Sequence, residues 1–144
     1  SPDQLTSNHG WDVKANLDFL SHIVEKLQSA NIRSSIFVDA DCEQIAFAAK
    51  TGTDRVELYT EPYASGYAKD RAAAIAPFIE AARKARECGL GLNAGHDLSL
   101  KNLRYFCEQI PWVEEVSIGH QLICDALYLG IAETIKQYQN CLKR

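Results

Sequence analysis

Two stretches of the sequence end in the same pair of residues, a glycine followed by a histidine. Gly95-His96 follows the apolar run 90–94, and Gly119-His120 follows the run 115–118. Glycine lets a backbone N–H approach a ligand closely, and a turn into a helix presents N–H groups that favour anions. Histidine at such a turn can donate to phosphate or transfer protons near neutral pH. The repeated pair predicts a site for a phosphorylated molecule, although each pair alone is also explained by a turn with a surface histidine.

A carboxylate lies within a third apolar stretch. Glu57 is flanked by Val56 and Leu58, and burying an unpaired carboxylate is costly. One interpretation is a salt bridge to Arg33 or Arg55. The other is a functional carboxylate that stabilises a cationic or proton-transferring state of a ligand.

These residues require a scaffold that brings strand ends together, and the apolar spacing predicts one. We expect strands at 33–39, 55–60, 90–94 and 115–118, helices at 13–30, 41–52, 70–88, 100–109 and 122–142, and a loop at 61–68. Strands that alternate with helices indicate a parallel sheet, whose active residues gather at the C-terminal strand ends. A complete (β/α)8 barrel needs about 250 residues. The 144 residues therefore predict either half a barrel or a small open α/β sheet.

Composition narrows the class of protein. An apolar fraction of 47% and a charged fraction of 24% are ordinary for one globular domain. The net charge of −4 argues against nucleic-acid and membrane-surface binding. Five cysteines without a C-x-x-C pair are typical of reduced thiols and speak against a zinc site. Neither a membrane-spanning run nor a signal peptide is visible, so we expect a cytoplasmic protein.

The order and spacing of several motifs resemble the pyridoxine 5′-phosphate synthase family, PdxJ. The resemblance covers all 144 residues and is carried by DQLTSNHGWDV (3–13), SIFVDAD (35–41), VELYT (56–60), GLNAGHDL (91–98) and VSIGH (116–120). It implies the C-terminal half of a (β/α)8 TIM barrel in a homo-octamer. It also implies condensation of 1-deoxy-D-xylulose 5-phosphate with 3-amino-1-hydroxyacetone 1-phosphate, without metal or cofactor, to give pyridoxine 5′-phosphate, inorganic phosphate and water.

The resemblance also assigns roles to particular residues. It implies a proton donor at His96, a transition-state stabiliser at Glu57, a substrate-binding loop residue at Thr6, a substrate-binding residue at Asp97, and a phosphate-binding pair at Gly119 and His120. The family often has glycine where this chain has Asp97, so that assignment departs from the pattern. From residue type alone, Thr6 is equally explained as part of a solvated loop.

The family's N-terminal half has no counterpart in this sequence. The resemblance places an Asn, an Asp-His pair, two arginines and a further catalytic histidine and glutamate there. The chain also contains no methionine and opens with Ser1-Pro2-Asp3. We therefore expect residues 1–144 to be a fragment of a longer chain that is inactive alone. The alternative is a non-catalytic half-barrel that binds inorganic phosphate or pyridoxine 5′-phosphate through Gly119 and His120.

Overall fold

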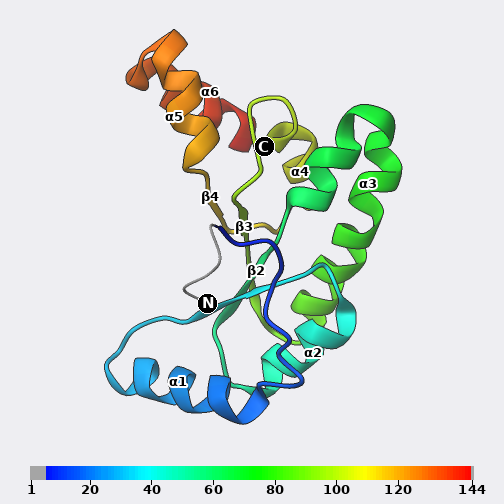
Figure 1. Ribbon diagram of the computed structural model, residues 1–144, viewed down its shortest axis with the longest axis vertical. Coiled ribbons are helices and arrows are strands. Elements are labelled where there is room, and N and C mark those ends of the chain that lie inside the picture. Colours follow the sequence, from blue (N-terminus) through cyan, green and yellow to red (C-terminus); the bar gives the residue numbers. More distant parts are fainter. Residues whose placement is uncertain (1–5, 144) are drawn as a thin grey trace.

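A computed structural model describes residues 6–143, and shows a parallel sheet whose strands alternate with helices (Figure 1). The elements are α1 (Leu17–Ser29), β1 (Ser35–Val38), α2 (Cys42–Lys50), β2 (Arg55–Leu58), α3 (Glu61–Glu87), β3 (Gly91–Gly95), α4 (Leu103–Gln109), β4 (Glu115–Ser117), α5 (His120–Leu129) and α6 (Ile131–Leu142). The strands are ordered β1-β2-β3-β4 and all pairs are parallel. The predicted α/β class with four parallel strands is confirmed. Residues 1–5 of the predicted opening loop lie outside the described part.

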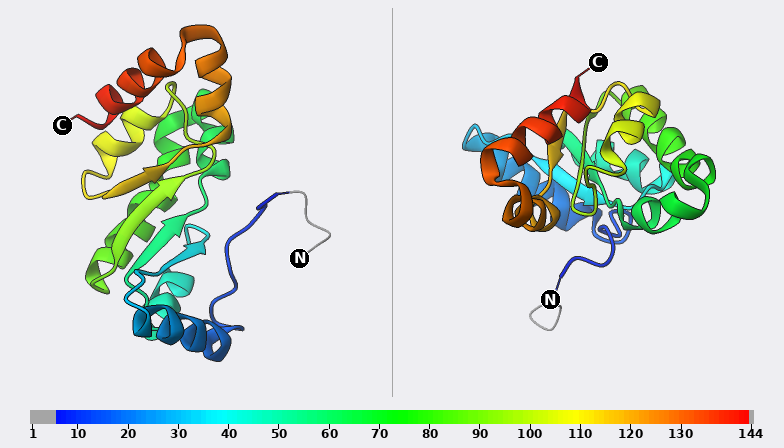
Figure 2. Two further views of the ribbon diagram at one scale, coloured as in Figure 1. Left: turned by 90° about the vertical axis from the view of Figure 1, so that its left-hand side faces the viewer. Right: turned by 90° about the horizontal axis from the view of Figure 1, so that it is seen from above.

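The sheet has one apolar face and one polar face, because successive side chains of a strand point to opposite sides. The apolar face is buried under α2, α3 and α4, and it carries Ile36, Val38, Val56, Leu58, Leu92 and Ala94. The N-terminal segment runs on the other side of the sheet (Figure 2). The strand register places Phe37, Glu57, Asn93 and Glu115 in one row across the polar face. The helices thus supply the core, and the polar face is left for other contacts.

Ion pairs and hydrogen bonds cross the polar face. Arg33, just before β1, donates two hydrogen bonds to the Glu115 carboxylate on β4, at 2.7 and 2.9 Å. Arg55 pairs with Glu114 at 2.7 Å and donates to the Asn93 side chain at 3.1 Å. Because β1 and β4 are the two edge strands, the Arg33–Glu115 pair spans the whole sheet. A sheet that curves toward its polar face brings these edges within reach of each other.

The loop predicted at residues 61–68 is wrong, because this segment is the first part of α3. Pro62 occupies the first turn, where a missing N–H breaks no intrahelical bond. Tyr63 is fully buried among other aromatic rings, so tertiary packing stabilises the helix here. Asp70 has non-helical backbone angles and its side chain accepts from the N–H groups of Ala72 and Ala73. The helix predicted to begin at Asp70 therefore starts there as a second segment after a kink.

The single helix predicted at residues 122–142 is also wrong. It is two helices, α5 and α6, separated by Gly130, whose φ of +78° is a conformation that favours glycine. The Gly130 N–H closes α5 on Ala126, and its carbonyl accepts from Thr134 in α6. This break folds α6 back against α5 and α4.

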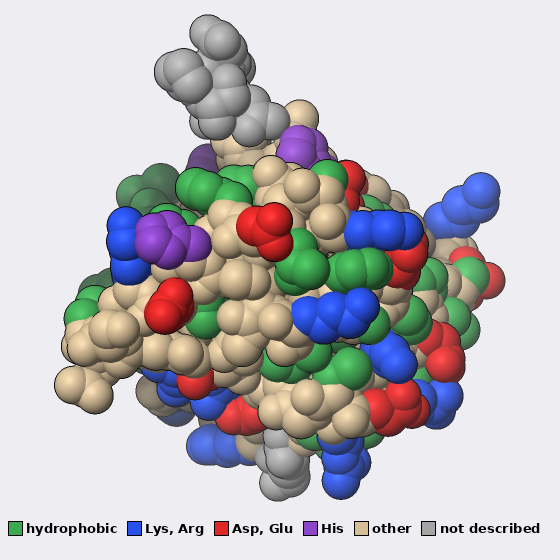
Figure 3. Space-filling model, turned by 90° about the horizontal axis from the view of Figure 1, so that it is seen from below, with side chains coloured by type: hydrophobic (Ala, Val, Ile, Leu, Met, Phe, Trp, Pro, Cys, Tyr) green, Lys and Arg blue, Asp and Glu red, His purple; other side chains and the backbone are tan. Residues whose placement is uncertain are grey.

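The described surface carries mixed charges. The face seen from below shows Lys and Arg side chains interspersed with Asp and Glu, without a large patch of one sign (Figure 3). Within residues 6–143, every helix is too short or too polar to cross a membrane.

Candidate functional site

The ends of β3 and β4 and the start of α3 border one cavity of about 370 Å³. It is lined by Glu61, Ala64, Ser65, His96, Asp97, His120 and Gln121. Both predicted Gly-His turns therefore contribute their histidine to the same cavity, although 24 positions separate them. The sequential strand order explains this, because it places the C-terminal ends of neighbouring parallel strands side by side.

His96 is held by contacts on its backbone and on both ring nitrogens. Its Nδ1 lies 2.8 Å from the Asp97 carboxylate, and its Nε2 lies 3.5 Å from the Thr6 hydroxyl. Its backbone N–H donates to the Ser117 carbonyl at 2.9 Å. An acceptor at Nδ1 fixes the ring orientation and leaves Nε2 as the nitrogen that can exchange a proton with a bound molecule. This geometry suits a general acid or base.

Thr6 reaches His96 because the N-terminal segment is anchored at the end of β1. The Gly10 N–H donates to the Asp39 carboxylate at 2.8 Å, and the Trp11 N–H donates to the Phe37 carbonyl. A Cβ at Gly10 would lie 2.3 Å from the Asp39 backbone nitrogen, so only glycine permits this approach. Thr6 is exposed, and its hydroxyl approaches His96 at the outer limit of a hydrogen bond.

Glu57 lies on the polar face and does not line the cavity. The proposed salt bridge to Arg33 or Arg55 is wrong, because these two arginines pair with Glu115 and Glu114 instead. Burial raises the pKa of the Glu57 carboxyl above its ordinary value, and electrostatic interaction with His96 partly offsets this increase. Glu57 is thus a partly desolvated carboxyl group within electrostatic range of the His96 ring.

Gly119 and His120 begin α5, whose N-terminus borders the cavity. Gly119 is the N-cap residue and no side chain caps this helix end. A Cβ at Gly119 would meet nothing within 4 Å, so the protein leaves space around this backbone. An uncapped helix N-terminus with space before it can accept an anion.

The cavity carries two acidic side chains, Glu61 and Asp97, and neither Lys nor Arg lines it among the described residues. His96 and His120 are the lining side chains that can carry a positive charge. In the described part of the chain, no three His, Cys, Asp or Glu residues are grouped so that they could hold a metal ion.

Two strand-end residues shape the site through contacts that the sequence interpretation did not predict. Thr60 is fully buried, and its hydroxyl donates to the Gly95 carbonyl and lies 3.4 Å from the Asp97 N–H. Gly95 packs so closely on β4 that a Cβ there would lie 2.2 Å from the Ser117 carbonyl oxygen. The available signal was the position of Thr60 at a strand end, equivalent to that of the Gly-His pairs.

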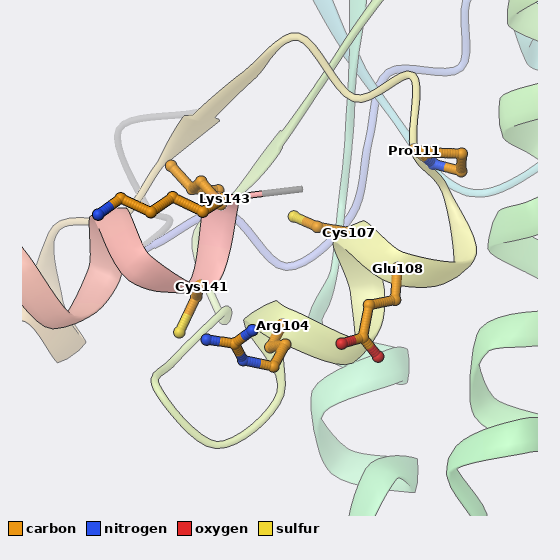
Figure 4. A pocket seen from close by; sticks show the side chains of 7 residues that line it. Arg104, Cys107, Glu108, Pro111, Cys141 and Lys143 are labelled. Carbon is orange, nitrogen blue, oxygen red and sulfur yellow. The ribbon is translucent and has the colours of Figure 1, made fainter.

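A second cavity, of about 250 Å³, lies between α4 and the end of α6 (Figure 4). It is lined by Arg104, Cys107, Glu108, Pro111, Cys141, Leu142 and Lys143. None of the predicted site residues belongs to it. The strand-end cavity is therefore the candidate site.

The sequence matches known proteins over almost its whole length. The family model described as "Pyridoxal phosphate biosynthesis protein PdxJ" matches residues 1–144. The pyridoxine 5′-phosphate synthase of Bacteroides thetaiotaomicron is 64% identical over 142 residues, which are 99% of this chain and 60% of that protein. The synthase of Cytophaga hutchinsonii is 52% identical over 140 residues, or 97% of this chain and 59% of that protein. The chain thus spans about three fifths of the length of these relatives.

Proposed function

Because the chain belongs to the PdxJ family, we propose that it is the C-terminal half of a barrel enzyme that makes pyridoxine 5′-phosphate. The proposed reaction condenses 1-deoxy-D-xylulose 5-phosphate with 3-amino-1-hydroxyacetone 1-phosphate and releases inorganic phosphate and water. The observation that carries the proposal is the convergence of His96, Asp97 and His120 in one cavity at the strand ends. The polypeptide in which this chain is joined to the N-terminal strands is called the full-length protein below.

Three features support the half-barrel. Each strand lies beside the next strand of the sequence, so the strand order in the sheet never reverses. This order is that of a (β/α)8 barrel and differs from that of a doubly wound sheet. The helices bury one face of the sheet and leave the polar face uncovered. The Arg33–Glu115 pair crosses that face between the edge strands. Four further strands that close the barrel would cover this face and both edges.

The proposed mechanism assigns a separate task to each part of the site. The amine of one substrate condenses with the ketone of the other to an imine, and the ketone oxygen leaves as water. His96 protonates a leaving oxygen through Nε2, while Asp97 holds Nδ1. Glu57 stabilises positive charge that develops as phosphate and water leave. Thr6 contacts the substrate beside His96, and the α5 N-terminus with Gly119 and His120 binds a phosphate group.

We propose that the 144-residue chain is inactive alone. Each substrate carries a phosphate, and a phosphorylated ligand is best held by Arg or Lys. The described lining of the cavity offers neither, and it adds the negative charges of Glu61 and Asp97. The missing cations are expected from the N-terminal half of the barrel.

We propose a homo-octamer in the cytoplasm as the working state of the full-length protein. Large apolar side chains of α5 support further contacts, since Leu127 is 80% exposed and Tyr128 is 91% exposed. Cys42, Cys88, Cys124 and Cys141 are free thiols, which agrees with a reducing compartment.

The test compares four proteins in an assay of pyridoxine 5′-phosphate formation. They are the full-length protein, its His96→Asn and His120→Asn variants, and the 144-residue chain alone. We expect His96→Asn to lower kcat by roughly 100-fold or more with little change in KM, because it removes the proton donor. His120→Asn should mainly raise KM. A near-wild-type kcat for His96→Asn would remove His96 from the mechanism, and turnover by the chain alone would contradict its proposed inactivity.

A non-catalytic phosphate-binding module gives a different result. The full-length protein would then bind phosphate and pyridoxine 5′-phosphate in calorimetry, weaken on His120→Asn, and form no product. The two functions are thus separated by turnover of the wild-type protein.

A further inference from the structure

Thr60 stands at the start of α3 but does not cap it. Threonine at the N-cap position usually accepts a hydrogen bond from an N–H of the first turn. Here no side-chain cap is formed. The hydroxyl turns instead to the neighbouring strand end, where it donates to the Gly95 carbonyl and accepts from the Asp97 N–H at 3.4 Å. One side chain thus holds the residues on both sides of His96.

His96 has a backbone conformation that needs such support. Its φ of +46° lies in the left-handed region, which residues other than glycine rarely adopt. A conformation of this kind persists only where its surroundings enforce it, and such residues concentrate at active sites. The His96 N–H is tied to Ser117 on β4, and the Leu98 N–H closes the turn on the Gly95 carbonyl. Thr60 supplies the contacts from the β2 side.

Thr60 is too deeply buried to touch a ligand. Its exposed fraction is 0%, and it does not line the cavity. Any influence on catalysis must therefore pass through the turn that it holds.

We propose that Thr60 is a positioning residue that sets the His96 ring for proton transfer. This proposal rests on the proposed function, in which His96 Nε2 meets the substrate. Without the Thr60 hydroxyl, the Asp97 N–H loses its acceptor and the Gly95 carbonyl loses a donor. The turn then relaxes toward an ordinary backbone conformation, which displaces both the His96 ring and the Asp97 carboxylate that orients it. Displacement of a reacting group by about 1 Å can lower a rate 100-fold.

The experiment uses variants of the full-length protein. Thr60→Val keeps the shape and removes the hydroxyl, while Thr60→Ser keeps the hydroxyl. Thr53→Val is the matched control, because Thr53 is also buried and hydrogen-bonded but lies before β2, away from the cavity. We expect Thr60→Val to lower kcat roughly 10- to 100-fold, with KM within about threefold of wild type. Thr60→Ser should recover most of the rate, and Thr53→Val should keep it.

A spectroscopic measurement reports on the turn itself. In NMR spectra of protein labelled at histidine, the His96 ring signals should move in Thr60→Val and remain in place in Thr60→Ser and Thr53→Val. If Thr60→Val does not fold, Thr60→Ala is measured with the same expectation. The proposal is overturned by wild-type kcat in the hydroxyl-free variant, by failure of Thr60→Ser to recover the rate, or by an equal loss in Thr53→Val.

Failure of this proposal can be told from failure of the proposed function. If His96→Asn is inactive while Thr60→Val is fully active, only the role of Thr60 is refuted. If His96→Asn is itself fully active, the role of His96 in the proposed function is refuted.

Discussion

Gly95→Ala is expected to destabilise the protein strongly, although the substitution adds only one methyl group. The added Cβ would lie 2.2 Å from the Ser117 carbonyl oxygen and 2.9 Å from its carbon, both backbone atoms of the paired strand β4. Neither can rotate away, so β3 and β4 must separate locally. Overpacking of this kind costs about 1–3 kcal/mol, and rigid backbone on the receiving side favours the upper end.

One effect works in the opposite direction. Replacing glycine by alanine restricts the unfolded chain and stabilises the folded state by about 0.4–1 kcal/mol. The net loss expected for Gly95→Ala is therefore about 2 kcal/mol. For a protein of this size class, a loss of about 2 kcal/mol lowers Tm by roughly 4–8 °C.

The assay is thermal unfolding of the full-length protein, with Gly119→Ala as the matched control. A Cβ at Gly119 meets nothing within 4 Å, so its Tm should stay within about 2 °C of wild type. The same control should weaken phosphate binding, if a phosphate approaches the Gly119 N–H as proposed. A Tm for Gly95→Ala equal to that of Gly119→Ala would refute the argument from strand packing.

Three further predictions concern single interactions in the full-length protein. Asp41→Ala should lower stability by about 1 kcal/mol in thermal unfolding, because Asp41 caps α2 through the N–H groups of Glu43 and Gln44; Asp41→Asn should retain most of it. Burial raises the pKa of the Glu57 carboxyl above its ordinary value of 4.5. Ionisation of this group therefore destabilises the folded state as the pH rises above 4.5. Glu57→Gln should then stabilise by up to about 1 kcal/mol at pH 7, and this gain should vanish as pH falls toward 4; a pH-independent gain would contradict this. If a closed barrel buries Arg33 and Glu115, a double-mutant cycle should give a coupling free energy well above the ~1 kcal/mol of an exposed ion pair. A smaller coupling free energy would argue that this face of the sheet is open to solvent.

Local chemistry predicted where several helices end, but the predicted start of α1 was wrong, because the helix begins at Leu17 and not at residue 13. Asp41 caps α2, and Asn31, Gly52 and Gly89 end helices with positive φ angles as their residue types indicate. The two wrong elements depended on remote contacts or on one backbone angle. Residues 61–69 are helical because Tyr63 packs on rings distant in the sequence. Gly130 divides the predicted last helix in two, although a helix can also continue through a glycine.

The candidate site, like the fold, was only partly predictable from the sequence. Residue types and their places on the strands indicated His96, Glu57 and His120 as candidates. The structure brings His96 and His120 to one cavity, because parallel strands present their C-terminal ends at one edge. Which partner each side chain meets was not predictable, since a carboxylate in a strand carries no information about the residue opposite it. One of the two interpretations of Glu57 gave it an arginine partner, whereas Arg33 pairs with Glu115 and Arg55 pairs with Glu114.

The sequence by itself determined the order of the elements and the residue types at the strand ends. These follow from side-chain chemistry and from spacing along one chain. Only the tertiary structure decided that Thr60 supports the His96 turn, that Gly95 lies against β4, and that Thr6 meets His96 across 90 positions. Such contacts join segments far apart in sequence, so they depend on strand register and on the curvature of the sheet, which no local pattern specifies.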